Sequence, residues 1–217
     1  MTHPLEPALR SGLAALELQP TDGQVDQLLD YLALLQKWNK VYNLTAVREP
    51  AEMLTHHLLD SLAVIRPLVD QVRGRPIRLL DVGSGGGLPG VVIAICCPDI
   101  EVDCVDTVAK KAAFIRQVAA GLGLANLHGL HDRVEQLAGP YDVIASRAFA
   151  SLPDFVSWSA GALAADGFWM AMKGKLPDDE IAGLPATAVV FHVEQLTVPG
   201  LAADRCLIWL RPTADVT

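Results

Sequence analysis

The stretch Asp81-Val-Gly-Ser-Gly-Gly-Gly-Leu-Pro-Gly90 lies between two short apolar runs of the chain. An apolar run that ends in a cluster of glycines is typical of a buried parallel strand, and the run after the cluster is typical of a helix. Gly83, Gly85 and Gly87 allow the backbone to turn tightly and to approach a ligand with no Cβ in the way. This order of strand, glycine loop and helix predicts a cofactor-binding site at the loop.

Around this loop, strand patterns alternate with helix patterns from residue 76 onward. We expect strands at residues 77–82, 100–106, 125–130, 141–146 and 168–172, with helices at 88–95, 108–121 and 153–163. Residues 189–198 and 206–211 are strand-rich and are expected to close the sheet as an antiparallel pair. The pattern predicts an α/β, Rossmann-like fold: a mainly parallel seven-stranded sheet with helices on both faces, whose ligand lies at the carboxyl ends of the strands.

The first seventy or so residues have helical patterns instead. Thr21 and Gln24 form a capping-box pattern before a long amphipathic helix. A second helix is expected from Ala51 to about Ile65, where Pro67 should stop it. We therefore predict that residues 1–75 form a helical extension that packs on a core of residues 76–217, within one structural domain.

Two classes of cofactor fit the glycine loop. Its spacing matches a dinucleotide fingerprint, in which a pyrophosphate sits on the helix N-terminus. However, Asp81 precedes the first glycine by two residues, and its carboxylate would repel a pyrophosphate while attracting the ammonium of a methionine moiety. The sequence therefore favours S-adenosylmethionine and a class I methyltransferase.

Acidic residues follow the next two predicted strands. Asp106 ends the second strand, where a carboxylate commonly accepts hydrogen bonds from ribose hydroxyls. It also precedes a helix that it could cap, and the two roles are compatible. Asp132-Arg-Val-Glu135 follows the third strand, where this fold holds an adenine ring; a solvated charged turn is the alternative.

The fourth strand leads into Ser146-Arg-Ala-Phe149, and this segment lacks the Asn/Asp-Pro-Pro-aromatic motif of enzymes that methylate exocyclic amino groups. Guanine N7 carries a lone pair and no proton, so its methylation requires placement without a base. Arg147 is then the candidate catalytic residue, through substrate positioning, with a structural ion pair as the alternative. His57 and Asp60 lie three apart, on one helix face; with no third ligand at metal-like spacing, we expect a polar face near the cofactor and no metal site.

Composition limits the possible locations and partners. The chain has 217 residues, 51% of them hydrophobic, which suits one buried core. It has no apolar run of bilayer length and no signal-like start, so a cytoplasmic protein is expected. The formal net charge is −8, so any RNA contact must come from a local basic patch.

Taken together, these segments resemble the RsmG (GidB) family of bacterial 16S ribosomal RNA guanine-N7 methyltransferases. The segments that carry the resemblance occur in family order: Tyr42-Asn-Leu-Thr-Ala46, His57-Leu-Leu-Asp-Ser-Leu62, the glycine loop, Ser146-Arg-Ala-Phe-Ala-Ser151 and Lys173-Gly174. The resemblance implies methylation of a guanine N7, that of guanosine 527, in the 530 loop of the small-subunit RNA. It implies cofactor contacts by Gly83, Leu88, Val134, Glu135 and Arg147.

Three other functions remain open at this point. One is an NAD-dependent oxidoreductase, which the glycine spacing permits. Another is a class I methyltransferase that acts on a protein or a small molecule, which the acidic balance permits. The third is a non-catalytic assembly factor that retains the cofactor pocket. For the favoured reading we expect 16S ribosomal RNA, or the small ribosomal subunit and its assembly intermediates, as partner of a monomeric enzyme with no membrane contact.

Overall fold

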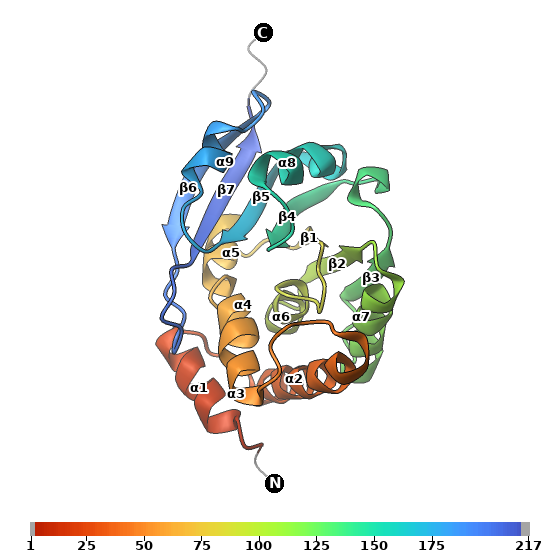
Figure 1. The fold of residues 1–217 in the computed structure, drawn as a ribbon, viewed down its shortest axis with the longest axis vertical. Helices are drawn as coiled ribbons and strands as arrows, with labels where there is room; N and C mark the ends of the chain where they lie inside the picture. Colours follow the sequence, from red (N-terminus) through yellow and green to blue (C-terminus); the bar gives the residue numbers. More distant parts are fainter. Residues whose placement is uncertain (1–2, 214–217) are drawn as a thin grey trace.

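The computed structural model describes residues 3–213 and contains a seven-stranded sheet of order β3-β2-β1-β4-β5-β7-β6. Its strands are β1 (Ile77–Val82), β2 (Ile100–Asp106), β3 (Leu127–His131), β4 (Tyr141–Arg147), β5 (Leu163–Lys173), β6 (Ala188–Gln195) and β7 (Cys206–Pro212). The first five strands are parallel, and β7 is antiparallel to both β5 and β6. The predicted mainly parallel sheet with an antiparallel closing pair is confirmed (Figure 1).

Helices cover both faces of the sheet, as predicted. Neighbouring residues of β1 belong to two separate apolar clusters: Leu79 belongs to the first cluster and Leu80 to the second. The first cluster includes α6 (Gly90–Cys96), α7 (Ala109–Leu122) and the N-terminal helices, whereas the second includes α8 (Leu152–Ser159). Because side chains alternate along a strand, each face of the sheet has an apolar layer of its own.

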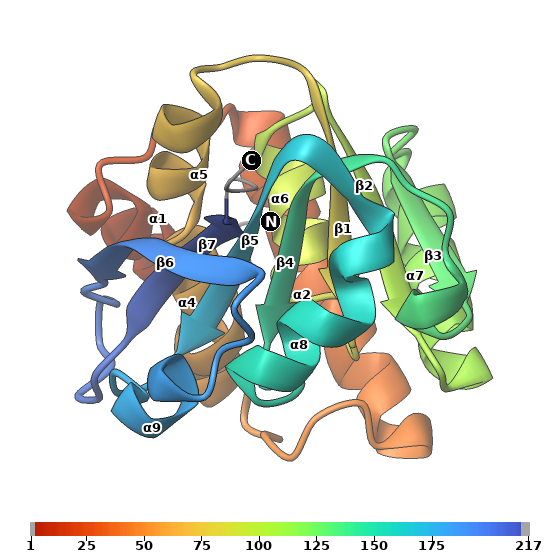
Figure 2. The same cartoon turned by 90° about the horizontal axis from the view of Figure 1, so that it is seen from above.

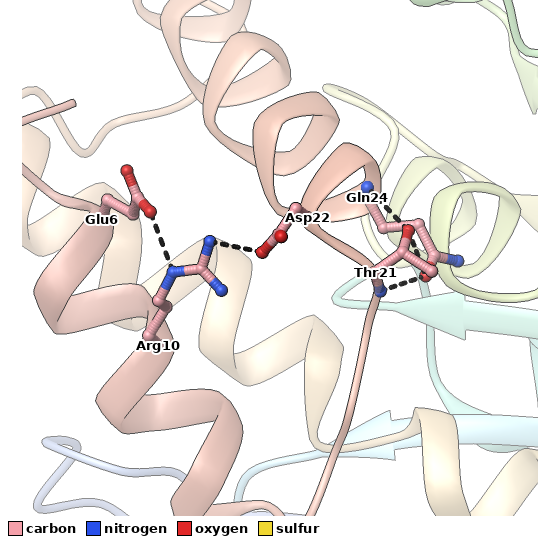
Figure 3. A network of polar contacts seen from close by, with 5 residues as sticks. All are labelled: Glu6, Arg10, Thr21, Asp22 and Gln24. Atoms are coloured by element: carbon pink, nitrogen blue, oxygen red, sulfur yellow. Dashed lines mark hydrogen bonds and ion pairs between the residues drawn. The ribbon is translucent and has the colours of Figure 1, made fainter. Parts of the chain in front are cut away.

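The N-terminal region is helical, and its apolar side chains join the first cluster. Its elements are α1 (Glu6–Ala15), α2 (Asp22–Tyr42), α3 (Pro50–Met53), the π-helical η1 (Leu54–Leu59), α4 (Asp60–Leu62) and α5 (Ile65–Val72). The capping box of α2 is present: the Thr21 amide donates to Gln24 Oε1 at 2.9 Å, and the Gln24 amide donates to Thr21 Oγ1 at 3.2 Å. Figure 3 shows this cap beside Arg10, which bridges Glu6 and Asp22 at 2.8 Å each and so links α1 to the start of α2.

Two predicted boundaries are wrong. Pro67 does not stop a helix but lies in the first turn of α5, where its missing N–H breaks no helical hydrogen bond. Strand β5 begins at Leu163, five residues earlier than predicted, because Leu163 pairs with Tyr141 before an irregularity in the register. Asp166 and Gly167 are typical of turns and conceal this part of the strand in the sequence.

The loop between α2 and α3 lies beyond the carboxyl ends of the parallel strands. Figure 2 shows this loop, α8 and α9 (Asp178–Ala182) on the side toward which β4 and β5 point. This edge is where the open α/β sheet is expected to bind its ligand. Among residues 3–213, no helix is both long and apolar enough to cross a membrane.

Candidate functional site

Two cavities open at the carboxyl ends of β1, β2 and β4, and they share Gly83 and Ala148 as lining residues. The first has a volume of about 520 Å³ and is bounded by the glycine loop, the α2–α3 loop, η1 and the end of β4. The second, of about 450 Å³, lies between the ends of β2 and β3, the segment after β4 and the last turn of α8. Together they form a two-part site around the glycine loop.

The predicted cofactor residues divide between the two cavities. Gly83, Gly85, Leu88 and Arg147 line the first, and Gly83, Asp106, Val134 and Glu135 line the second. Two predicted residues, Asp81 and Gly87, line neither of these cavities: Asp81 is buried beneath the loop, and Gly87 faces the helices on which the loop packs.

The glycines of the loop differ in what surrounds them. Gly83 and Gly85 have φ of +66° and +56°, a conformation that favours glycine. A Cβ on Gly83 would collide with the Phe149 ring, whereas one on Gly85 would meet no atom closer than 3.9 Å. A Cβ on Gly87 would collide with Val91 and Ile115, so this glycine permits packing of the loop on the helices beneath it.

Helix α2 supports the glycine loop through two residues. The buried Tyr31 hydroxyl donates to the Gly86 carbonyl at 2.7 Å. Leu35, from the next turn of α2, lines the first cavity and also approaches Gly86 closely enough to leave little room for a Cβ there. No local sequence pattern predicts this support, because Tyr31 and Gly86 lie 55 positions apart.

Asp81 is fully buried beneath the loop. One carboxylate oxygen accepts from the Gly90 amide at 2.9 Å, and Oδ1 has no partner among the described residues. Burial raises the pKa of Asp81 to about 7, which the Gly90 hydrogen bond and the charge of Arg147 moderate. The buried Ser84 hydroxyl also has no partner in the described part of the chain. These buried oxygen atoms suit a bound ammonium group, reached directly or through water.

Asp106 organises the second cavity through three contacts. Its Oδ2 accepts from the Gly85 amide and from Lys111 Nζ, both at 3.1 Å, and its Oδ1 accepts from the Val108 amide at 2.9 Å. The predicted capping role is wrong: the N-cap of α7 is Val108, no side chain caps this helix, and Asp106 instead holds the turn before it. The position of Asp106 on the cavity wall is compatible with the ribose role.

Two aromatic residues complete the second cavity. The rings of Phe149 and Trp158 meet edge to face with their centroids 5.9 Å apart, and Trp158 remains 42% exposed. Val134 is buried and Glu135 is exposed on the same wall. This mixture of apolar surface and one carboxylate suits a nucleoside base.

Arg147, at the end of β4, forms the ion pair that was its predicted alternative role. Its Nη1 donates to Asp60 Oδ2 at 2.8 Å and to the His56 carbonyl at 3.1 Å. Asp60 is 2% exposed, and its Oδ1 accepts from Arg205 Nε at 2.7 Å. Both arginines line the first cavity, so one buried carboxylate holds two cations on its wall. Arg205 was missed because it lies 145 residues from Asp60.

His57 is the other buried polar residue of this wall. Its Nε2 lies 2.6 Å from Thr45 Oγ1, and its Nδ1 has no partner within the described residues. Burial and, to a smaller extent, the charge of Arg147 lower the pKa of His57 to about 4. The imidazole is therefore neutral near pH 7. The expected polar face of His57 and Asp60 beside the cofactor loop is confirmed.

Lys173 closes the cavity at the end of β5. Its Nζ donates to the Ala150 carbonyl at 3.0 Å and to Glu180 Oε2 at 2.8 Å. The same Glu180 oxygen accepts from the Leu152 amide, at the start of α8. Lys173 thus connects the strand end, the segment after β4 and α9.

Comparison with known proteins gives consistent results. A family model described as GidB, rRNA small subunit methyltransferase G, matches residues 24–208. Ribosomal RNA small subunit methyltransferase G of Acidovorax ebreus (strain TPSY) is 67% identical over 218 residues, which cover 97% of this chain and 96% of the relative. The protein of the same name from Acidovorax sp. (strain JS42) is 69% identical over 217 residues, which cover 96% of each chain.

Solved structures share the fold at much lower identity. The 1,6-didemethyltoxoflavin-N1-methyltransferase of Burkholderia thailandensis, solved with S-adenosylhomocysteine, has a TM-score of 0.57 and 15% identity. The match covers 85% of this chain and 90% of that one. The predicted class I methyltransferase fold is confirmed.

Proposed function

The chain belongs to the family of rRNA small subunit methyltransferase G, whose members use S-adenosylmethionine, and we propose that it methylates N7 of guanosine 527 in the 530 loop of 16S ribosomal RNA. Membership of this family excludes the alternative function of an NAD-dependent oxidoreductase, which the glycine spacing permitted. The position of the methyl group on the RNA is the part that rests on the chemistry of the site.

The donor groups of the site fit S-adenosylmethionine. The nucleoside would occupy the second cavity, with Asp106 available to the ribose and Val134 and Glu135 beside the base. The methionine moiety would lie along the glycine loop, with its ammonium toward the Asp81 side and its carboxylate toward Arg147. When bound, the cofactor supplies a methyl group on a cationic sulfur, which a lone pair can attack.

The observation that carries the proposal is that His57 and Asp60, the two buried residues on the wall of the first cavity that could accept a proton, are both poorly suited to act as a base, while the third such residue, His56, is exposed. His57 has a pKa of about 4, so it accepts a proton poorly near neutral pH. Both oxygens of Asp60 are held by arginines. Guanine N7 requires no proton acceptor, because its lone pair is already available. An exocyclic amino group or a ring N–H would have to lose a proton during the reaction.

The residues then act by binding and orientation. Arg147 and Arg205 are held in place by Asp60, which reduces the freedom that their side chains would lose on binding. Correct placement of the two reactants accounts for up to roughly 7–11 kcal/mol of a reaction barrier. Leu88 and the glycine loop line the first cavity and would cover one side of the methionine moiety.

The proposal is tested by incubating the purified protein with labelled S-adenosylmethionine and small-subunit RNA from cells that lack the gene. Methylation of N7 makes the glycosidic bond labile, so the RNA backbone can be cleaved chemically at that nucleotide. We expect label in the RNA and a single new cleavage site at guanosine 527. Label without cleavage would place the methyl group on another atom. Absence of label, both in the free RNA and in small subunits from the same cells, would favour a non-catalytic assembly factor.

Three further properties belong to this proposal. The protein acts as a monomer in the cytoplasm, on free 16S RNA or on the small subunit and its assembly intermediates. Residues 1–75 and 76–217 form one structural domain, a proposal supported by the hydrogen bond between Tyr31 and Gly86 and by the apolar cluster that includes both parts. Residues 1–2 and 214–217 of these ranges lie outside the described part of the chain.

A further inference from the structure

Tyr42, the last residue of α2, is an exposed aromatic residue with no role in the cofactor site. Its side chain is 37% exposed, and the neighbouring Val41 is 69% exposed. The exposed Tyr42 ring places aromatic surface in water, at the helix end that leads into the α2–α3 loop. Such surface close to a substrate cavity is typical of a binding site.

The Tyr42 ring is supported from one side by two further rings. Its centroid lies 5.1 Å from that of Trp38, which lies 5.4 Å from that of Phe114 in α7. Phe114 is fully buried, so this row of rings leads from the core to the surface. A supported ring loses little conformational freedom when another flat group stacks on it.

The loop that follows Tyr42 is fixed relative to the first cavity. The buried Asn39 side chain accepts from the Thr45 amide at 2.9 Å and donates to the Val47 carbonyl at 3.1 Å. Thr45 and Val47 line the first cavity. Tyr42, three residues before Thr45, is therefore held close to the wall of the first cavity.

The same helix end is joined to the second cavity through α7. Lys110 Nζ lies 6.0 Å from the centre of the Tyr42 ring, and the next residue, Lys111, binds Asp106 on the wall of that cavity. Tyr42 is thus connected to both parts of the site and belongs to neither.

Exposed cations lie on the segments next to Tyr42, although the chain as a whole carries a net charge of −8. Lys37 and Lys40 in α2, Arg48 in the loop and Lys110 in α7 are all exposed, and none of them forms an ion pair with a residue in the range 3–213. Lys110 lies over the Tyr42 ring, and Arg48 donates to Asn43 Oδ1, beside Tyr42 in the chain, at 3.4 Å. Two carboxylates, Glu49 and Glu52, follow Arg48. An aromatic face with unpaired cations nearby is the combination that binds single-stranded RNA, by base stacking and by phosphate contacts.

We propose that Tyr42 is a stacking platform for an unpaired nucleotide beside the target guanosine, with Lys110 and Arg48 as contacts to its phosphates. The proposal rests on the proposed function, because it requires an RNA substrate whose bases can leave a duplex. Stacking tolerates any base, since every base has an aromatic face. The platform would therefore contribute affinity and orientation, whereas base pairing in the RNA and the cavity would select the guanosine.

The test compares Tyr42→Ala with Tyr42→Phe and with the neighbouring control Val41→Ala in the full-length protein. The probe is small-subunit RNA from cells that lack the gene, and the dissociation constants for this RNA and for S-adenosylhomocysteine are measured separately. Tyr42→Ala should raise the RNA constant about 5- to 100-fold, which is typical for the loss of one stacked base. Tyr42→Phe keeps the ring and should stay within about twofold of the wild type, as should Val41→Ala.

All three variants should bind S-adenosylhomocysteine within about twofold of the wild type. The stacking proposal is overturned if Tyr42→Ala binds RNA as the wild type does, or if Tyr42→Phe loses as much RNA affinity as Tyr42→Ala. It is also overturned if Tyr42→Ala loses cofactor affinity and RNA affinity together, because that result indicates a structural role. Failure of the wild-type protein to methylate this RNA is a different result, which counts against the proposed function itself.

Discussion

Asp60 Oδ2 accepts a hydrogen bond from Arg147 at 2.8 Å, across 87 residues of sequence, on the wall of the first cavity. The other Asp60 oxygen binds Arg205. The two arginines therefore share one structural partner, but only Arg147 comes from the strand end next to the glycine loop. This arrangement allows the structural and the cofactor roles of Arg147 to be separated by experiment.

We expect Arg147→Ala to lower the single-turnover rate on the order of a hundredfold, because a misplacement of about 1 Å has an effect of that size. Arg205→Ala is the matched control, since it also removes one partner of Asp60. Both variants should lose similar thermal stability, whereas cofactor affinity should fall only in Arg147→Ala. If calorimetry gives equal cofactor affinities for the two variants, Arg147 serves only as an ion-pair partner of Asp60.

Gly85→Val should abolish measurable cofactor binding, because its branched side chain would extend into the first cavity. The substitution also strains the backbone, since Gly85 has φ of +56°. Gly123→Val controls for that strain: Gly123 has φ of +66°, lies at the end of α7 and has no neighbouring atom within 4 Å of an added Cβ. If both variants bind S-adenosylmethionine equally well, the glycine loop does not form the cofactor site.

For Asp106, the ribose role predicts that Asp106→Ala weakens cofactor binding by roughly 1.5–3 kcal/mol, as for other hydrogen bonds to a charged group. Asp106→Asn keeps one oxygen as an acceptor and should lose less cofactor affinity than Asp106→Ala. Calorimetry and thermal melting are measured on the same samples. A lower melting temperature with less than a twofold change in affinity would leave Asp106 only its structural contacts with Gly85, Val108 and Lys111.

The sequence patterns predicted the elements that local periodicity specifies. The glycine loop, its flanking strand and helix, and the alternation of strands and helices specify the sheet, and the capping box of α2 lies at Thr21 and Gln24 as predicted. What remained hidden depends on contacts between distant segments. Neither Arg205 beside Asp60 nor Tyr31 beneath Gly86 belongs to a local pattern, since these pairs lie 145 and 55 residues apart and meet only in the tertiary structure.

Local signals also failed where tertiary pairing overrides them. Pro67 is usually a helix breaker, but the chain begins a new helix at Ile65, which makes the proline acceptable in its first turn. Among the site residues, Gly87 shows that a motif can combine two functions: part of the glycine cluster leaves room for a ligand, and Gly87 leaves room for Val91 and Ile115.

The chemical step should depend weakly on pH between about 6 and 9, because guanine N7 has no proton to lose. His57 does not titrate in this range, since its pKa of about 4 leaves it neutral throughout. The rates must be measured at saturating cofactor, because Asp81 has a pKa of about 7 and loses its charge below that pH. A rate that rises tenfold per pH unit in the wild type, and does not do so in His57→Ala, would mean that the enzyme removes a proton.

Mass spectrometry of small-subunit RNA from cells with and without the gene is the most direct test of the proposed reaction. Cells that carry the gene should contain 7-methylguanosine at position 527, and cells that lack it should contain unmodified guanosine there. The wild-type gene should restore the modification, and the gene for Gly85→Val should not. An unchanged guanosine 527, or the loss of a methyl group from a different nucleotide or a different atom, would contradict the proposed reaction.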